Sequence, residues 1–251
     1  MTDNLYRRID LHVHTRLSMC AGREMRLASI VEACAERGVE CLGITDHIDA
    51  HVGPGILQEA REELERLEKP VNVFLGCEAD VLSVGRHMVT DEMRSTLDFV
   101  MLSANHFHDD AVAQPKADSL EAIGRHFLEM FRYACSLDFA DVIAHPLVVF
   151  PRTFDPTCLY LIKEGDLADA IDVARANEVA MEISPRALVH DQLEFRLRFL
   201  SMCKDAGLKF SIGSDAHTLE NVGRTAVLAP IIEKVGITDS DIWLPTGGGR
   251  T

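Results

Sequence analysis

Two pairs of side chains able to bind a metal ion are each separated by a single residue. Residues 8–13 alternate between apolar and polar side chains, which is the period of a β-strand. In a strand His12 and His14 point to the same face, about 6.5–7 Å apart along the backbone, so both imidazoles can bind one ion from the same side. Asp215 and His217 repeat this spacing after another apolar run. Both pairs therefore predict metal ligands.

Four single side chains of the same chemistry complete a set of eight donors: His47, Glu78, His106 and His145. One four-coordinate ion cannot use eight ligands, whereas two or three ions can, with positions left open for water and substrate. Such a centre lowers the pKa of bound water toward about 7 and clamps a phosphoryl group during in-line displacement. The pattern thus indicates hydrolysis of a phosphate ester by a metal-activated hydroxide.

The elements that must position these donors follow one scheme. A short apolar run ends in a His, Asp or Glu motif, and helical patterns lie between most of these runs, as at residues 24–37, 57–68 and 119–135. The seven predicted strands cover residues 8–13, 41–44, 71–75, 99–102, 142–144, 179–181 and 208–212. Strands that alternate with helices form parallel βα units, and seven of them favour a closed barrel with its active site at the carboxyl ends of the strands.

Composition narrows the class of protein. The 251 residues are 47% hydrophobic and 26% charged, typical of a globular chain, and carry a formal net charge of −15. We expect a single domain over residues 1–251, with a flexible tail near residues 245–251. The charge disfavours long nucleic acid as a partner. No run is long enough to span a membrane, the amino-terminal residues lack a secretory signal, and seven irregularly spaced cysteines suit a reducing compartment, so we expect a cytoplasmic protein.

Taken together, the strand-end motifs resemble those of the polymerase and histidinol phosphatase (PHP) family. In chain order they are Asp10-Leu11-His12-Val13-His14-Thr15, Thr45-Asp46-His47, Gly76-Cys77-Glu78, Asn105-His106, Ala144-His145-Pro146 and Gly213-Ser214-Asp215-Ala216-His217. The resemblance implies a distorted (β/α)7 barrel of the TIM type. It also implies a hydrolase that acts on phosphate esters with two or three divalent ions, usually zinc, iron or manganese.

The resemblance also implies how the ligands are shared. His12, His14, Glu78 and Asp215 would hold one ion, and Glu78 would bridge to a second ion bound by His106 and His145. His47 and His217 would hold a third, with Cys20 at a position where the family usually has a histidine. Glu78, Asp215 and His217 would then be the catalytic residues.

Four further residues are predicted to bind the substrate. Glu182-Ile183-Ser184 matches a Glu-Ile-Asn motif that lines the site in histidinol phosphatase-like members, which makes Glu182 a lining residue. Arg186 follows as the candidate phosphate fork, with Arg16 in reserve, because guanidinium groups pair with two phosphate oxygens at once. His190 completes the set. Asp10 and Asp46 are expected to orient ligand imidazoles.

Four hypotheses about function remain open at this point. The first is a phosphatase for a small phosphorylated substrate such as L-histidinol phosphate, a nucleotide or a sugar phosphate. The second is a PHP-type phosphodiesterase or exonuclease on short nucleic acids. The third is an amidohydrolase, which often uses a bridging lysine, although none of the six lysines ends a predicted strand. The fourth is a metal-binding regulator without catalysis. A homo-oligomer is compatible with all four.

Overall fold

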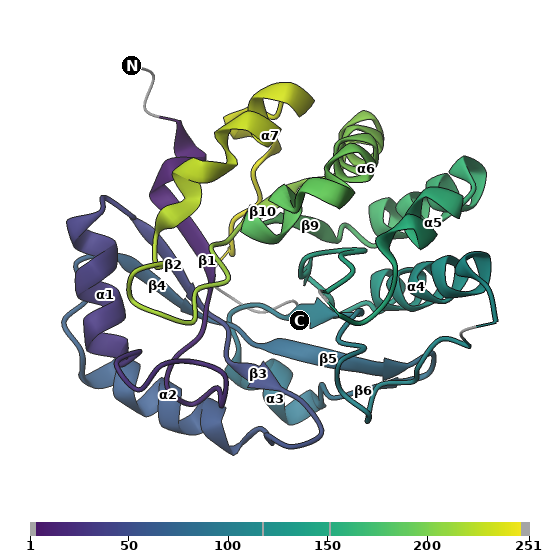
Figure 1. The fold of residues 1–251 in the computed structure, drawn as a ribbon. Coiled ribbons are helices and arrows are strands. Elements are labelled where there is room, and N and C mark those ends of the chain that lie inside the picture. Colours follow the sequence, from purple (N-terminus) through teal and green to yellow (C-terminus); the bar gives the residue numbers. More distant parts are fainter. Residues whose placement is uncertain (1–3, 117, 151, 247–251) are drawn as a thin grey trace.

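Parallel strands surrounded by helices make up the computed structural model, which describes residues 4–116, 118–150 and 152–246. Figure 1 shows the strands at the centre and the helices outside them. The strands are β1 (Ile9–Val13), β2 (Cys41–Ile44), β3 (His47–Ile48), β4 (Asn72–Leu75), β5 (Glu78–Ser83), β6 (Arg86–His87), β7 (Met101–Ser103), β8 (Val142–Ile143), β9 (Ala180–Ile183) and β10 (Phe210–Ile212). The helices are α1 (Leu27–Glu36), α2 (Gly55–Arg66), α3 (Asp91–Thr96), α4 (Leu120–Cys135), α5 (Glu164–Ala176), α6 (Leu193–Asp205) and α7 (Ala229–Val235).

Two sheets join to form the barrel. One has the order β1-β2-β4, the other β10-β9-β8-β7-β5-β3, and all neighbours along both paths are parallel. The chain passes directly from β2 into β3 and from β4 into β5, so each pair forms one bent stave. A bridge between Val13 and Ala216 brings β1 beside β10 and closes the circle. The staves are therefore β1, β2/β3, β4/β5, β7, β8, β9 and β10, which confirms the predicted barrel.

The predicted strands are all present, but β3, β5 and the antiparallel β6 were not expected. His47 and Glu78 were assigned to the polar ends of strands, whereas each begins a new strand, and the two pair with one another in register. The polar residues Thr45 and Asp46 form the bend within the stave β2/β3, and Gly76 and Cys77 form the bend within the stave β4/β5. Alternation of apolar side chains cannot reveal a strand that begins on a buried polar ligand.

No helix within the described ranges is long and apolar enough to cross a membrane. The predicted flexible tail lies mostly beyond them, since residues 247–251 are outside the described part of the chain.

Helix α4 illustrates how the outer layer packs. Ser119 caps its amino end by accepting a hydrogen bond from the amide of Ala122 at 3.1 Å. Phe127 and Phe131 lie on its buried stripe at helical spacing. Gly124 lies on the same side, where α4 meets the 3-10 helix η2 (Pro156–Leu161). A Cβ atom at Gly124 would lie 2.4 Å from the carbonyl oxygen of Cys158, so the close approach of these two elements requires glycine here.

We predict that Gly124→Ala lowers the free energy of unfolding by about 1–3 kcal/mol, because the methyl group must displace backbone in a packed interface. Gly165→Ala is the matched control. Gly165 lies in α5 with no atom within 4 Å of an added Cβ, so alanine there should be neutral or stabilise by up to about 1 kcal/mol. Chemical denaturation of both variants measures the difference. Equal effects would show that the α4–η2 contact does not constrain the fold.

Candidate metal centre

Four donors from three staves converge at the carboxyl end of the barrel. His12 and His14 come from β1 and the residue after it, Glu78 begins β5, and Asp215 follows β10. The Nε2 atoms of His12 and His14 lie 3.0 Å apart. Glu78 Oε2 lies 3.2 Å from His12 Nε2 and 3.5 Å from His14 Nε2, and Asp215 Oδ1 lies 3.8 and 3.4 Å from the same two atoms.

These separations fit a metal ion. Ligand atoms that each lie about 2.1 Å from a tetrahedral zinc are about 3.4 Å from one another. The distances from the Nε2 atoms of His12 and His14 to one another and to the oxygens of Glu78 and Asp215 span 3.0–3.8 Å around that value. His12, His14 and Asp215 also form one of the groups whose ligand atoms all lie within 4.8 Å of one another. The donor set therefore suits a divalent cation in both chemistry and spacing.

Glu78 serves two sides of the centre with its two oxygens. Oε2 faces His12 and His14, and it also lies 3.1 Å from Nδ1 of His47. Oε1 faces the Nε2 atoms of His145 at 2.8 Å and His106 at 3.4 Å. One carboxylate in contact with imidazoles on both sides has the geometry of a bridge between two ions.

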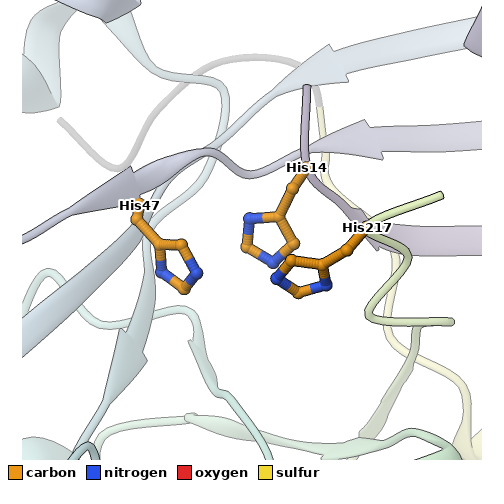
Figure 2. Close-up of side chains that lie close together, drawn as sticks. All are labelled: His14, His47 and His217. Atoms are coloured by element: carbon orange, nitrogen blue, oxygen red, sulfur yellow. The ribbon is translucent and has the colours of Figure 1, made fainter. Parts of the chain in front are cut away.

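A third group of donors consists of His14, His47 and His217, whose ligand atoms also lie within 4.8 Å of one another. Figure 2 shows the three imidazoles side by side, with His14 between the other two in the view. His14 and His217 have ring centroids 4.2 Å apart, and His14 and His47 4.3 Å apart. Cys20 is exposed and lines a cavity together with His47 and His217. Its sulfur belongs to none of the donor groups found among the described residues.

The outer nitrogens of three ligand histidines have partners behind the centre. Nδ1 of His12 lies 2.6 Å from Glu182 Oε1, and Nδ1 of His106 lies 2.7 Å from Asp80 Oδ1. The third is Nδ1 of His145, which lies 3.0 Å from the amide oxygen of Asn105. An oxygen acceptor on Nδ1 fixes the tautomer that leaves Nε2 free to bind a metal. Like the donor spacing, these contacts therefore suit the three imidazoles to bind metal ions through Nε2.

The acidic residues expected to orient the imidazoles hold loops instead. Asp46 accepts hydrogen bonds from the amide and hydroxyl of Thr15, both at 2.7 Å, and from the hydroxyl of Ser18 at 2.7 Å. Asp10 accepts from the amide and hydroxyl of Ser214 and from the amide of Gly223. Asp46 reaches an imidazole only through Ser18, whose hydroxyl lies 3.3 Å from Nδ1 of His14. The expected role in orienting an imidazole is therefore corrected for Asp10, which anchors the turn at Ser214, whereas Asp46 supports His14 through Ser18.

The electrostatics of the centre keep its two carboxylates ionised. Burial alone would raise the pKa of Glu78 and Asp215, but the surrounding imidazoles, with Arg186 beside Asp215, hold both pKa values well below their ordinary range. Both carboxylates are therefore ionised. Burial lowers the pKa of His14 to about 4, so this imidazole is neutral at physiological pH. Burial acts in the same direction on His12 and His106, but the neighbouring carboxylates raise the pKa of His12 and raise that of His106 to about 10. Metal binding would displace the proton from these two imidazoles.

Two of the predicted ligand residues occupy strained backbone conformations. His145 has φ of 28° and Asp215 has φ of 53°, both in the left-handed region that disfavours residues other than glycine. Strain of this kind costs about 1–3 kcal/mol per residue and persists where the surrounding structure imposes it. Here the amide of His145 donates to Glu182 Oε2 at 2.6 Å, so the buried Glu182 fixes both this backbone and the ring of His12. The strain directs both side chains into the centre.

The donors open onto a cavity of about 310 Å³, lined by Cys20, His47, Glu78, His106, His108, His145, Phe150, Arg186, Asp215 and His217. Arg186 lies at its edge with Nε 2.5 Å from Asp215 Oδ2 and its guanidinium carbon 5.3 Å from the centre of the Phe150 ring. Its side chain is 40% exposed, so the guanidinium faces the cavity rather than the core. A small anion held at the centre would meet this group.

The other predicted substrate residues are placed differently. Glu182 is buried behind His12 and does not line the cavity. Arg16 is directed toward α2, where its Nη2 pairs with Glu59 at 3.3 Å and Glu63 at 3.4 Å, so the structure does not bring it to the centre. His190 begins the 3-10 helix η4 (His190–Gln192), and its side chain is not among those described.

Sequence reasoning missed four residues around the centre. Asp80 lies two residues after Glu78 on the same strand, a spacing that could have identified it. His108 lies two residues after His106 and lines the cavity, with the two ring centroids 5.0 Å apart. Asn105 stood within a quoted motif without an assigned role. Phe150 carried no signal, because an apolar residue in a loop is indistinguishable from core in the sequence.

The geometry agrees with what comparison with known proteins finds. The PHP domain family model matches residues 10–185. The chain belongs to the PHP domain family. That match covers the motifs from the first histidine pair to Glu182, and Asp215 and His217 lie beyond it.

Individual relatives of this PHP chain are of two kinds. A probable phosphatase of Photobacterium profundum is 28% identical over 237 residues, covering 90% of this chain and 85% of the relative. The DNA polymerase/3'-5' exonuclease PolX of Bacillus subtilis is 25% identical over 219 residues, which are 84% of this chain. The aligned region spans only 34% of the length of that polymerase.

Solved structures support the fold. The histidinol phosphate phosphatase of Lactococcus lactis, solved with zinc, L-histidinol and phosphate, superposes with a TM-score of 0.65 at 15% identity. That superposition covers 95% of this chain and 99% of the other. A protein of Listeria monocytogenes proposed to be a histidinol phosphatase gives a TM-score of 0.64 at 11% identity over 87% of this chain and 98% of the other. Both share the architecture of this PHP barrel.

Replacement of Asp80 by asparagine should weaken metal binding by about 10–100-fold, because the ligand His106 loses its charged acceptor. Competition with a chromophoric zinc chelator measures the affinity directly. Asp172→Asn, an exposed aspartate on α5, is the control and should leave the affinity unchanged. Equal zinc affinities for Asp80→Asn and the unaltered protein would contradict a role for Asp80 in supporting a ligand.

Proposed function

We propose that this PHP protein is a metal-dependent phosphatase that hydrolyses phosphate monoesters of small molecules. The observation that carries the proposal is Glu78, a buried carboxylate that contacts imidazoles through both oxygens beside a cavity containing Arg186. Family membership and the relative described as a probable phosphatase support the same reaction. When bound, two or three divalent ions would lower the pKa of a water molecule and neutralise charge on the phosphoryl oxygens.

Different residues would bind the ions and the phosphate. His12, His14, Glu78 and Asp215 would bind one ion, Glu78 would bridge to the side of His106 and His145, and His47 and His217 would bind a third. This division depends on Glu78, because its Oε2 faces His12, His14 and His47 whereas its Oε1 faces His106 and His145. Participation of Cys20 in the third group requires movement of its loop toward His47 and His217, because its sulfur lies outside that group here.

Arg186 would bind the phosphate. Its Nε is engaged by Asp215, which fixes the plane of the guanidinium and leaves the two Nη groups for phosphoryl oxygens. Phe150 lies against its carbon, so the side chain is held on two sides. Burial would lower the pKa of Arg186, but the neighbouring carboxylates Asp215, Glu78 and Glu182 raise it, so the group stays charged.

Hydrolysis of short phosphodiesters is the alternative, favoured by the similarity to the polymerase/3'-5' exonuclease of Bacillus subtilis. The net charge of −15 opposes a long polyanion but not a dinucleotide, since bound ions would dominate the local potential. An assay of phosphomonoesters, 3′,5′-linked dinucleotides and amides with added Mn²⁺, Zn²⁺ or Fe²⁺ distinguishes these reactions. We expect phosphomonoesters to be hydrolysed most efficiently. Faster turnover of dinucleotides would favour the alternative, and turnover of amides alone an amidohydrolase.

Loss of a ligand should abolish this activity without unfolding the barrel. Replacement of Asp215 or His145 by alanine should lower turnover of a phosphomonoester by at least about 100-fold, more than the loss expected for a residue that only supports a ligand. His51→Ala, a histidine whose side chain is 63% exposed, is the control and should retain activity. Circular dichroism checks the fold of each variant. Undiminished turnover in Asp215→Ala would exclude the proposed centre as the site of hydrolysis.

A further inference from the structure

A second cavity, of about 710 Å³, adjoins the metal cavity and shares three of its lining residues, Arg186, Asp215 and His217. Its other lining residues are Pro185, Leu188, Val189, Ser214, Asn221, Arg224 and Val227. They come from the segments after β9 and β10 and from the 3-10 helices η3 (Pro185–Leu188) and η5 (Arg224–Leu228). Because the two cavities meet at Arg186, a molecule with phosphate at the metal centre can extend past this residue into the second cavity.

Hydrolysis of a phosphate monoester breaks the bond between phosphorus and the ester oxygen, adds the oxygen of water to phosphorus, and releases an alcohol or phenol that gains a proton. The released part must therefore lie beside the phosphate. The metal cavity measures about 310 Å³ and its walls are mostly metal donors, which leaves little space for a large group. The second cavity is more than twice that size and contains four apolar side chains, as a partly apolar released group requires.

The charge of the second cavity is unusual for this chain. Two arginines line it, against one carboxylate, that of Asp215, which is already bound to Arg186. The carboxylate partner of Arg224 is Glu220, at 3.1 Å, but Glu220 does not line the cavity and its side chain is 81% exposed. In a protein with a net charge of −15, the described lining of this cavity therefore offers arginine without a free carboxylate.

Arg224 can exchange its partner for a ligand. Its ion pair with Glu220 is exposed, and exposed pairs of this kind are weak and screened by salt. The Oδ1 atom of Asn221 lies 3.4 Å from Nη1 of Arg224, so an amide stands beside the guanidinium on the cavity wall. Together they can donate hydrogen bonds to a carboxylate or phosphate oxygen.

We infer that the second cavity binds the released part of the substrate and selects an apolar group that carries a second negative charge. This inference rests on the proposed phosphatase activity and specifies its substrate class. Esters whose released part is cationic, including L-histidinol phosphate with its ammonium group, find no free carboxylate among the described lining residues. Arg224 is the residue that determines this preference.

Three phosphate esters of matched size test the charge preference. They are phenyl phosphate, 4-carboxyphenyl phosphate and 4-(aminomethyl)phenyl phosphate, with neutral, anionic and cationic released groups. For the unaltered protein we expect kcat/KM to be highest for the anionic ester and lowest for the cationic one. A fourth ester, 1,4-phenylene bisphosphate, shows whether a phosphate or a carboxylate suits Arg224 better.

The variant Arg224→Gln should lower kcat/KM for 4-carboxyphenyl phosphate by about 5–10-fold through KM, in keeping with the loss of one partly exposed charged contact. The fall in kcat/KM for phenyl phosphate, which has no second charge, should be smaller than the fall for 4-carboxyphenyl phosphate, and Arg224→Lys should restore part of the preference. Arg175→Gln is the matched control, because Arg175 also pairs with a nearby acid on its own helix, Asp172 at 3.0 Å, but lines neither cavity.

The outcomes separate the two proposals. Hydrolysis of the esters with the same charge preference in the unaltered protein and in Arg224→Gln would overturn the inference and leave the phosphatase proposal standing. Efficient hydrolysis of the cationic ester by the unaltered protein would also overturn it. Hydrolysis of none of the four esters, with any of the three metals, would overturn both.

Discussion

Burial of a carboxylate is the constraint around which this centre is built. Glu78 is 1% exposed, and a buried charge without partners is strongly destabilising. Its oxygens are surrounded by five imidazoles, those of His12, His14, His47, His106 and His145. These imidazoles come from several different staves, so the charge is satisfied only when the barrel is closed. The buried carboxylate and the closed barrel therefore depend on one another.

The bent staves explain how Glu78 reaches this position. If β4 simply ended at Leu75, Glu78 would lie on a loop above the barrel. Instead the chain turns at Gly76 and Cys77 and continues as β5, which pairs with β3 on one side and β7 on the other. Glu78 is thereby in register with His47 and Met101 at the level of the strands. A residue on a strand is held more rigidly than one on a loop, and a bridge between ions needs that rigidity.

The barrel, and the His, Asp and Glu side chains that gather at its carboxyl end, could be predicted from the sequence because both leave local signals. Apolar runs of strand length show the staves, and a His, Asp or Glu after each run shows the ligands. The partners of those ligands leave no such signal: Asp80 meets His106 and Glu182 meets His12 only after distant strands are aligned. The same reason explains Asp46, whose motif suggested contact with imidazoles although its oxygens anchor the turn at Thr15 and Ser18. Contacts across staves are decided by register, which sequence periodicity does not contain.

The geometry of the site shows how the negative charge of the chain bears on the size of its substrate. Glu78 and Asp215 are ionised at the centre, and the raised pKa values of His12, His106 and Arg186 place positive charge beside them. Bound divalent ions would make the local charge positive, and Arg186 would extend the positive region to the edge of the cavity. Beyond this edge most of the molecule remains negative, which opposes extended polyanions but not a compact ester whose charges all lie near the centre. A confined positive region within a negative protein would by itself favour small substrates, with no separate structural barrier.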